Sequence, residues 1–444
     1  MIRRTLQRLQ SGEPRTPLRL AAATLAALAV AAALYGLSGC ESKPKIGQPP
    51  PGPIMSSLRG EPTVRVRIAP HAQDAVISGA PTLLVGPYPP VSGQNTELSF
   101  VAPVRVSRRL EGFVIQAASG RAKQWSLSAL RVRPAAGATL TVEGTTYPSL
   151  LTLHPAHATA NAYDIVNHVP LEQYLPGVIA KELYPTWHAE AFKAQAIAAR
   201  SYAIIQFANN THRHFDLENT ESSQVYGGTT TNQTALSAVR ATHGLVLTWE
   251  NRILPAYFSS CCGGTGQDAA IAFPRGLDIP PLRGTQHGGW CAAASTYRWG
   301  PIVRNVDEVS TRIAAWGSAQ NHPIAALKPI QRIAVTVTNR VGRPARFALT
   351  DTAGRTYDLG PEEFRFACNY EAPGLPALDP NQKLKSSHVT ANVVGTAVQF
   401  IDGRGHGHGV GLCQWGAQGI AMKGYNAPSI LAFYYPQAVL KRAY

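Results

Sequence analysis

Charged residues are scarce in this sequence. Asp, Glu, Lys and Arg make up only 15% of its 444 residues, and the 26 acids are outnumbered by 41 bases. So little charge, beside 45% hydrophobic residues, excludes a disordered polyelectrolyte and predicts a globular protein. The length suffices for two domains or for one large domain with a sizeable core. The net charge of +15 favours polyanions, so nucleic acid, anionic lipid and bacterial cell wall all qualify as partners.

Signatures of nucleotide and zinc sites are also missing. The sequence has no P-loop and no Gly-x-Gly-x-x-Gly in a strand-turn-helix setting, so nucleotide binding is unsupported. Its six cysteines include no Cys-x-x-Cys pair, and their wide separation argues against zinc. One or two disulfides are the favoured alternative for an exported chain. The pairing cannot be read from the sequence, and the odd number of cysteines after Cys40 leaves at least one thiol unpaired. The cysteines concerned are Cys261, Cys262, Cys291, Cys368 and Cys413.

The N-terminus has the composition of an export signal. Five arginines precede an uncharged apolar run from residue 20 to residue 37, which ends in Leu37-Ser-Gly-Cys40. Residues 1–39 are therefore predicted to be a signal peptide, and the last four residues resemble the bacterial lipobox, in which the cysteine is lipidated. The alternative is an uncleaved anchor, because about 18 apolar residues can just span a bilayer. We expect a lipid-anchored envelope protein, facing the periplasm or on the outer membrane of a diderm host, with no nucleic-acid partner.

An α+β fold is predicted for the remainder, with Ala-rich helices in the centre and β-rich segments on either side. Residues 41–62 are Pro-rich and indicate a tether. Short apolar runs separated by Gly or Pro then predict a β-rich region over 63–168. The runs begin with the alternation Val64, Val66, Ile68 and continue at 82–85, 104–106, 113–116, 130–132 and 140–142.

A second region, 169–444, begins with helical spacing. Apolar residues from Leu171 to Ile179 and an Ala-rich run over 189–208 predict two helices, divided at Tyr184-Pro185. The second helix should be buried because its alanines allow close packing. Further along, the patterns predict a helix over 234–242, a hairpin over 245–258, a β-rich part over about 330–402, a Gly-rich loop, and helices over 415–422 and 428–434.

Glu182 is the first candidate for chemistry. It lies near the end of a predicted helix with Ile179, Leu183, Tyr184 and Trp187 around it. Apolar surroundings raise the pKa of a carboxyl group and keep it protonated near neutral pH, as a general acid requires. The alternative is an ordinary solvated carboxylate at a helix end, because most glutamate side chains in proteins are exposed to solvent.

Two further groups have chemical potential. Glycine occupies every other position from Gly403 to Gly411, which permits unusual backbone conformations and lets a ligand approach the main chain. His406 and His408 alternate with these glycines, but such a pair is weak support for a metal, and hydrogen bonding to a loop or substrate is the favoured interpretation. Lys193 and Arg200 lie two helical turns apart, hence on one face, and either bind a carboxylate or form a solvated stripe.

The segment from Val169 to Ala203, with Ala180-Lys-Glu-Leu-Tyr-Pro185 inside it, resembles the signature of the stage II sporulation protein D and amidase-enhancer family, SpoIID/LytB. The resemblance covers roughly residues 60 to 444. Its other landmarks follow in family order: Gln224-Val-Tyr-Gly-Gly228, Tyr257-Phe-Ser-Ser-Cys-Cys-Gly-Gly264, Phe364-Arg365, Leu384-Lys-Ser-Ser387, Gln414-Trp-Gly416 and Tyr434-Tyr-Pro436.

The resemblance implies a peptidoglycan lytic transglycosylase that cleaves peptide-stripped glycan strands, with Glu182 as the catalytic acid and then base. It implies no cofactor. The substrate-binding positions that we carry over or infer are Lys193, Arg200, Tyr202, Ser387, His408 and Gln414. A sporulation role does not follow, because division or wall remodelling would serve equally well.

The chain departs from the family pattern in two places. Glu221-Ser-Ser223 stands where some relatives have zinc-binding Cys and His, which makes zinc doubtful, and His406 replaces a commoner aromatic residue. A second hypothesis is a glycan-binding protein that stimulates a cell-wall amidase, as amidase enhancers do. A third, a polyanion-binding module without a specific ligand, leaves Glu182 unexplained.

Overall fold

The computed structural model describes residues 52–53, 58–90, 96–109, 112–126, 128–137, 139–156, 161–220, 223–273 and 276–444. All of them belong to one of the two units into which the chain divides, Lys45–Tyr444. The predicted signal peptide, the predicted lipidation site Cys40 and most of the predicted tether lie outside the described residues. Within these ranges, no helix combines the length and the apolar character needed to cross a membrane.

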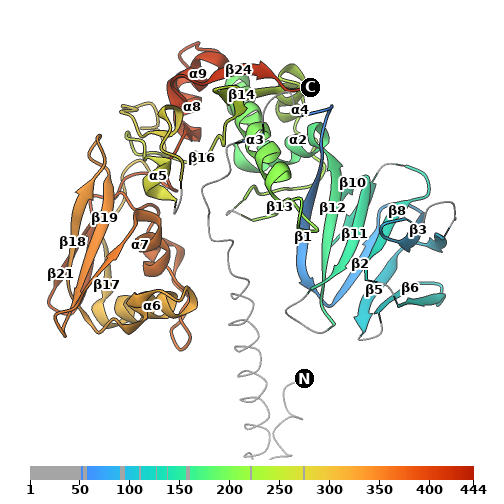
Figure 1. Ribbon diagram of the computed structural model, residues 1–444, viewed down its shortest axis with the longest axis horizontal. Helices are drawn as coiled ribbons and strands as arrows, with labels where there is room; N and C mark the ends of the chain where they lie inside the picture. The colour runs from blue at the N-terminus through green and yellow to red at the C-terminus, as the bar shows by residue number, and fades with distance from the viewer. Residues whose placement is uncertain are drawn as a thin grey trace, which may run out of the picture. The chain divides into compact units, whose positions relative to one another are not determined.

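Two sheets account for the first β-rich stretch (Figure 1). Their strands pair antiparallel throughout, except that β13 joins β1 in parallel. In sheet order, the seven-stranded sheet contains β13 (Leu217–Glu218), β1 (Thr63–Ala72), β12 (Tyr163–Pro170), β11 (Leu150–Pro155), β8 (Leu130–Pro134), β3 (Thr82–Pro87) and β4 (Leu98–Val101). The six-stranded sheet contains β10 (Thr145–Pro148), β9 (Thr139–Val142), β2 (Asp74–Ser78), β5 (Val104–Arg109), β6 (Gly112–Ala117) and β7 (Ala122–Trp125).

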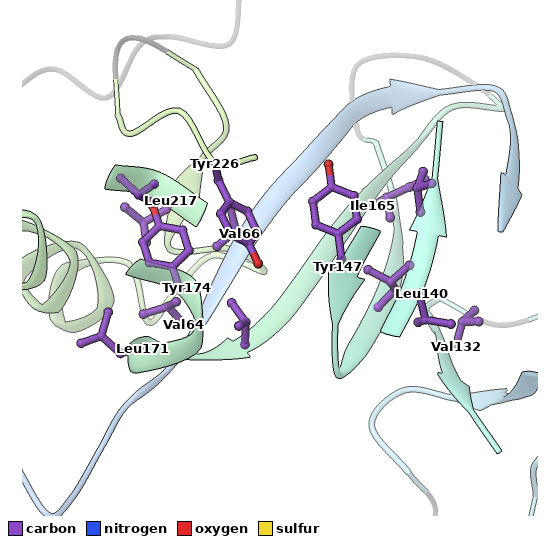
Figure 2. Packing of buried hydrophobic residues seen from close by; sticks show 14 of the residues in the cluster. Val64, Val66, Val132, Leu140, Tyr147, Ile165, Leu171, Tyr174, Leu217 and Tyr226 are labelled. Carbon is purple, nitrogen blue, oxygen red and sulfur yellow. The ribbon is translucent and has the colours of Figure 1, made fainter. Parts of the chain in front are cut away.

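The alternation that predicted the first strand holds only for its first residues. Val64 and Val66 are fully buried, and Val64 pairs with Val169 of β12. Arg67, predicted on the outer face, is buried as well, and Ile68 is only partly buried, because the register shifts after Arg67. One hydrophobic cluster continues from these strands into the helices that follow, and Figure 2 shows Val64 and Val66 near Leu171 and Tyr174. The predicted boundary between 168 and 169 remains a prediction, since this cluster contains residues from both sides of it.

Three helices follow β12 and confirm the helical predictions for this stretch. They are α2 (Leu171–Glu182), α3 (Ala189–Asn209) and α4 (Gln233–Ala241). The ring of His188 begins α3 by accepting a hydrogen bond from the Glu190 backbone N–H, and the Ala-rich helix is buried along most of its length, as predicted. Helices and sheets together establish the α+β class.

The C-terminal segment returns to α3. Helices α8 (Gln414–Ala421) and α9 (Ala427–Tyr434) both contact α3, and β24 (Val439–Arg442) pairs with β14 (Leu245–Trp249). The predicted hairpin is correct as far as β15 (Arg252–Ile253). Phe258 instead belongs to β16 (Phe258–Ser259), which pairs in parallel with β23 (Leu412–Cys413) and so connects the middle of the chain to the start of α8.

A separate hydrophobic cluster is formed by the stretch of sequence between β16 and β23. Its elements are β17 (Ile302–Asn305), α6 (Val306–Ala319), β18 (Ile330–Thr338), β19 (Pro344–Asp351), β20 (Thr356–Leu359), α7 (Pro361–Cys368), β21 (Thr390–Val394) and β22 (Ala397–Ile401), while α5 (Ala269–Ala272) precedes them. Helix α6 was not predicted from the sequence. Its signals were present: Asn305 caps the first turn by accepting from two backbone N–H groups, and Asp307 and Glu308 favour a helix N-terminus.

A buried ion pair joins α2 to α3 and to the chain's end. The Arg200 guanidinium, 0% exposed, donates from Nε and Nη2 to the two carboxylate oxygens of Glu172 at 2.8 Å each. Glu172 also accepts from the Tyr444 hydroxyl at 2.6 Å and the Gly244 N–H at 3.2 Å. Burial alone would raise the pKa of Glu172, but these hydrogen bonds and the charge of Arg200 hold that pKa below its usual value.

We expect Glu172→Gln to lower the free energy of unfolding by about 3 kcal/mol at pH 7, because it leaves the buried Arg200 charge uncompensated. The contribution of a carboxylate with a depressed pKa is complete above its unfolded-state pKa and is lost as the pH falls through the folded-state value. Denaturant unfolding at several pH values should therefore show the gap between wild type and variant closing below about pH 4. Glu371→Gln, at an exposed position, should cost under about 0.5 kcal/mol. Equal effects of both substitutions would contradict the assignment.

Candidate active site

Glu182 is the last residue of α2, where the chain turns away from the helix axis. The next residue, Leu183, is buried and extended, and its N–H closes the helix on the Ile179 carbonyl at 3.1 Å. The Glu182 side chain is half-buried. Its Oε2 accepts a hydrogen bond at 2.9 Å from Nε2 of Gln414, the first residue of α8. The tertiary structure therefore brings the predicted acid and one predicted substrate-binding residue together.

Three aromatic rings gather beside this contact. The ring of Trp187 lies 5.3 Å from that of Tyr184 and 4.9 Å from that of Trp415, and Tyr184 and Trp415 are 5.7 Å apart. Tyr184 is 59% exposed, so the group, here called the aromatic platform, reaches solvent. Trp415 was not among the predicted site residues, although its position directly after Gln414 could have indicated it. Flat rings beside a carboxyl group suit a ligand with apolar faces and ether oxygens, such as a sugar chain.

Backbone and side-chain hydrogen bonds hold α8 and α9 against the start of α3. The His188 N–H donates to Oε1 of Gln418 at 2.8 Å, and the Ala427 N–H donates to Oε2 of Glu190 at 2.7 Å. Lys193 donates to the other oxygen of Glu190 at 2.6 Å. Lys193 is thus already paired, with a third of its side chain, 33%, exposed. Its role toward substrate stays a prediction.

Arg200 and Ser387 do not reach the surface. Arg200 is fully buried and its charge is compensated by Glu172. Ser387 is fully buried as well and donates to Oε1 of Glu362 at 3.2 Å. The interpretation of these two residues as ligands for substrate is therefore corrected: both stabilise the protein's interior.

Tyr202 and His408 belong to a second aromatic group. Ring centroids are 6.2 Å apart between Tyr202 and Tyr257, 4.6 Å between Tyr257 and Phe273, and 5.1 Å between Phe273 and His408. Burial raises the pKa of Tyr202 to about 12. Burial, and the nearby Arg365 and Arg343, lower the pKa of His408 to about 4, so both side chains are neutral at pH 7. Their contribution to substrate binding stays a prediction.

A hydrogen bond of His408 agrees with one of the two interpretations of the histidine pair. Its Nδ1 accepts a hydrogen bond from the Val410 N–H at 2.9 Å, within its own loop. A ring nitrogen engaged in this way makes the loop contact that we favoured over a metal ligand. The His406 backbone pairs with Cys261 on both sides, through its N–H at 2.7 Å and its carbonyl at 3.1 Å.

The Gln224-Val-Tyr-Gly-Gly228 motif lies beneath α2. The Tyr174 hydroxyl donates to Oε1 of Gln224 at 3.0 Å, and Nε2 of Gln224 donates to the Ala199 carbonyl of α3 at 3.3 Å. The ring of Tyr226 lies 4.8 Å from that of Tyr174, as Figure 2 illustrates. Burial raises the pKa of Tyr174 well above its usual value, and the charge of Glu182 adds to this. The motif therefore supports the helix that carries Glu182.

The Gly-rich loop packs against its own chain. The buried Arg343 donates from Nη2 to the carbonyls of Gly407 and His408 at 3.4 and 3.2 Å, and Nε1 of Trp299 donates to the Gly405 carbonyl at 2.8 Å. A Cβ atom at Gly409, whose φ is +74°, would lie 2.3 Å from Arg343 Nη1. The positive φ that the sequence indicated is present. The close approach, however, is made at this position by the protein's own arginine.

Replacing Gly409 by alanine should therefore cost more than a matched replacement elsewhere. Gly395 also has a positive φ, +58°, but a Cβ added there would meet no atom within 4 Å. We expect Gly395→Ala to cost ~1 kcal/mol of unfolding free energy for the left-handed backbone alone. Gly409→Ala should cost roughly 2 kcal/mol more, since Arg343 must move. Denaturant titration of both variants tests this, and equal losses would show that Arg343 gives way freely.

The cysteines do not form the predicted disulfides. All five that the structure describes are free thiols and all are buried. Four of them, Cys261, Cys262, Cys291 and Cys413, lie in one hydrophobic cluster, and Cys368 lies in another. The wide separation of the cysteines in the sequence argued against a shared site. The pairing of β16 with β23 nevertheless brings Cys261 and Cys262 close to Cys413.

Several known proteins resemble this chain. The family model of the stage II sporulation protein matches residues 159–249. An uncharacterized protein of Brachyspira hyodysenteriae is 29% identical over 273 residues, covering 61% of this chain and 66% of that protein. The amidase enhancer of Bacillus subtilis is 26% identical over 293 residues, covering 60% and 40%. Stage II sporulation protein D of the same organism is 26% identical over 306 residues, covering 65% and 79%.

The chain thus spans just under two thirds of the Brachyspira protein and less than half of the amidase enhancer. The matched region contains Glu182 and the helices α2 and α3 that frame it. With the ordered motifs that continue to the C-terminus, these matches show that the chain is similar to proteins of the stage II sporulation protein D and amidase-enhancer family.

Proposed function

We propose that this protein is a lytic transglycosylase of the bacterial cell wall. It would cleave the bond between N-acetylmuramic acid and N-acetylglucosamine in glycan strands already stripped of stem peptides. The observation that carries the proposal is the contact at 2.9 Å between Gln414 Nε2 and Glu182 Oε2 beside the aromatic platform. A half-buried carboxyl group held by an amide, next to rings that reach solvent at Tyr184, combines an oriented acid with a surface for sugars.

The proposed reaction needs one carboxyl group, which distinguishes it from ordinary hydrolysis. Glycosidases that use water require two carboxyl groups, one as acid and one as base or nucleophile. The neighbouring acids on α2 and α3 are held by cations, Glu172 by Arg200 and Glu190 by Lys193. A lytic transglycosylase needs only one carboxyl because its nucleophile is the C6 hydroxyl of the muramic acid residue itself.

Glu182 recovers its proton at the end of the proposed reaction. Glu182, protonated, donates a proton to the glycosidic oxygen as the C1–O bond breaks and the N-acetylglucosamine hydroxyl leaves. The resulting carboxylate then accepts the proton of the C6 hydroxyl as that oxygen bonds to C1 and closes the 1,6-anhydro ring. No water is consumed and Glu182 ends protonated. Gln414 donates to Oε2 and so orients the carboxyl group for these two proton transfers.

Substrate recognition would combine stacking and charge. Sugar rings present apolar faces that fit the aromatic platform of Tyr184, Trp187 and Trp415. The lactyl group of muramic acid keeps a carboxylate in stripped strands, and the net charge of +15 attracts such a polyanion. Lys193 is the basic candidate that retains an exposed part near α8 and α9, although any ligand must compete with Glu190 for it.

A second candidate function is stimulation of a cell-wall amidase by a glycan-binding protein without activity of its own. The similarity to the amidase enhancer of Bacillus subtilis supports it. The aromatic platform would serve glycan binding in this case too, whereas the Gln414–Glu182 contact would have no chemical purpose. Product formation therefore separates the two candidates.

We also propose that the protein is exported and held in the envelope by a lipid on Cys40. The basic residues before the apolar run and the Leu37-Ser-Gly-Cys40 ending support this location. An envelope position would place the protein beside its proposed substrate. Metabolic labelling with a palmitate analogue would test it, since a Cys40→Ala variant should lose the label.

We expect Glu182→Gln to reduce turnover of peptide-stripped strands by at least about 100-fold, because the amide can neither donate nor accept the reacting proton. Wild type and variant are incubated with stripped strands and with intact peptidoglycan, and products are identified by mass spectrometry. Wild type should release anhydromuramic ends from stripped strands only. Glu371→Gln, which changes an exposed acid in the same way, should keep full activity.

Two results would count against the enzyme. Anhydromuramic products that persist in Glu182→Gln would assign the chemistry to another group. No products from a folded wild-type protein that still binds strands would favour the amidase-stimulating function instead.

The aromatic platform yields a separate prediction about affinity. Tyr184→Ala removes an exposed ring at little structural cost, and we expect roughly tenfold weaker binding of stripped strands, about 1.4 kcal/mol. Tyr425, 51% exposed beyond the other end of α8, provides the control, and Tyr425→Ala should bind as wild type does. Binding isotherms with the inactive Glu182→Gln background avoid cleavage during the measurement. Unchanged affinity in Tyr184→Ala would remove the platform from the binding surface.

A further inference from the structure

We propose that Cys261, Cys262, Cys291 and Cys413 bind one thiophilic divalent cation, for which zinc is the best fit. The cysteines come from three separate segments: the loop after β16, the loop around residue 291, and the end of β23 at the start of α8. All four are at most 1% exposed. This site is separate from Glu221 to Ser223, the positions at which some relatives are expected to bind zinc.

The sulfur positions fit a single ion. The Sγ atoms of Cys261, Cys291 and Cys413 all lie within 4.8 Å of one another, and Cys262 Sγ lies 3.6 Å from Cys291 Sγ. Tetrahedral zinc with Zn–S bonds of about 2.3 Å requires sulfur atoms about 3.8 Å apart. The group of Cys261, Cys291 and Cys413 needs only a small contraction to reach that geometry, and Cys262, which already lies at 3.6 Å from Cys291 Sγ, would complete it. A four-iron cluster would need its cysteines spread around a larger body.

Backbone groups are already directed at one of the sulfurs. The N–H of Cys262 donates to Cys413 Sγ at 3.2 Å, and the N–H of Gly416, in the first turn of α8, donates to it at 3.3 Å. Hydrogen bonds of this kind stabilise a thiolate, the form that binds metals, and orient a ligand. The contact with Gly416 also caps α8, and the same sulfur lies 3.9 Å from the Ser260 carbonyl.

Two buried polar atoms beside the sulfurs lack a partner. Neither Tyr434 Oη nor His287 Nδ1 has a hydrogen-bond partner among the described residues, and their rings are 4.8 Å apart. Tyr434 Oη and Cys413 Sγ face the same point, since a Cβ on Gly416 would meet them at 1.9 and 3.3 Å. Unsatisfied buried donors are costly, and thiolate sulfurs on a cation would accept a hydrogen bond from the tyrosine hydroxyl.

A disulfide is the competing use of these residues. The sulfurs of Cys262 and Cys291 are 3.6 Å apart, which is far from a bond of about 2.0 Å. A disulfide there would consume two thiols, release two protons and two electrons to an oxidant, and leave Cys261 and Cys413 without a role. Binding of a cation requires no oxidant: each coordinating thiol releases one proton as its sulfur bonds to the metal.

The site would hold the proposed catalytic contact in place. Cys413 directly precedes Gln414, whose amide holds Glu182, and the Cys261 backbone pairs with the Gly-rich loop at His406. A cation would therefore lock β16, β23 and the start of α8 together. The four cysteines are positioning residues in this view. Metal binding does not depend on the proposed reaction and can be measured without it.

The experiment measures metal and thiols in the purified full-length protein. We expect elemental analysis to find one zinc per chain, and Co²⁺ exchanged into the site to give the charge-transfer and ligand-field bands of tetrahedral thiolate coordination. After denaturation with a chelator, every cysteine after Cys40 should react with a thiol reagent. Cys291→Ser and Cys413→Ser should lose the zinc and the cobalt bands.

Cys368→Ser provides the matched control. Cys368 is also a fully buried free thiol, but it lies in the cluster around α6 and α7, so its replacement should leave zinc content unchanged. Wild type that binds neither zinc nor Co²⁺ after reconstitution under reducing conditions would overturn the proposal, whether its thiols prove free or paired. Loss of zinc in Cys368→Ser to the same extent as in Cys413→Ser would also overturn it, because the metal would then report on folding alone.

Discussion

The buried pair of Glu172 and Arg200 is the interaction on which the arrangement of the helices depends. A guanidinium without solvent contact must be neutralised inside the protein, and Glu172 does so with both carboxylate oxygens. The same carboxylate accepts from Tyr444 and from the Gly244 N–H, so the start of α2, the middle of α3, the end of α4 and the C-terminus share one polar centre. Glu182 lies at the opposite end of α2, and its position relative to α3 follows from this centre.

The other half of the candidate site comes from the chain's end. Gln414 and Trp415 lie outside the residues that the stage II sporulation protein family model matches, whereas Glu182 lies within them. Hydrogen bonds from His188 to Gln418 and from Ala427 to Glu190 hold α8 and α9 against α3. The carboxyl group and the amide that orients it therefore meet only because the C-terminal helices return to the Ala-rich helix.

The transglycosylase proposal and the cation proposal make separate demands on this region. The first depends on the proton held by Glu182 and on the aromatic platform beside it. The second depends on the sulfur atoms of four cysteines, one of which directly precedes Gln414. It concerns how strongly the start of α8 is held in place. A protein that binds zinc without cleaving glycan, or that cleaves glycan without binding zinc, is physically possible. The two properties can therefore be assigned by independent measurements.

Local patterns in the sequence determined the α+β class and the first strand, which contains Val64 and Val66. They also determined the bounds of α2, α3, α4, α8 and α9 to within a few residues. Glu182 could be found in the same way, because its apolar neighbours and its motif are adjacent in the chain. Only the tertiary structure decided that Gln414 touches Glu182, that Arg200 and Ser387 are buried, and that cysteines from three distant segments gather. The physical reason is the range of the interactions. Periodicity and capping act between residues a few positions apart, while burial and pairing depend on which distant segments pack together.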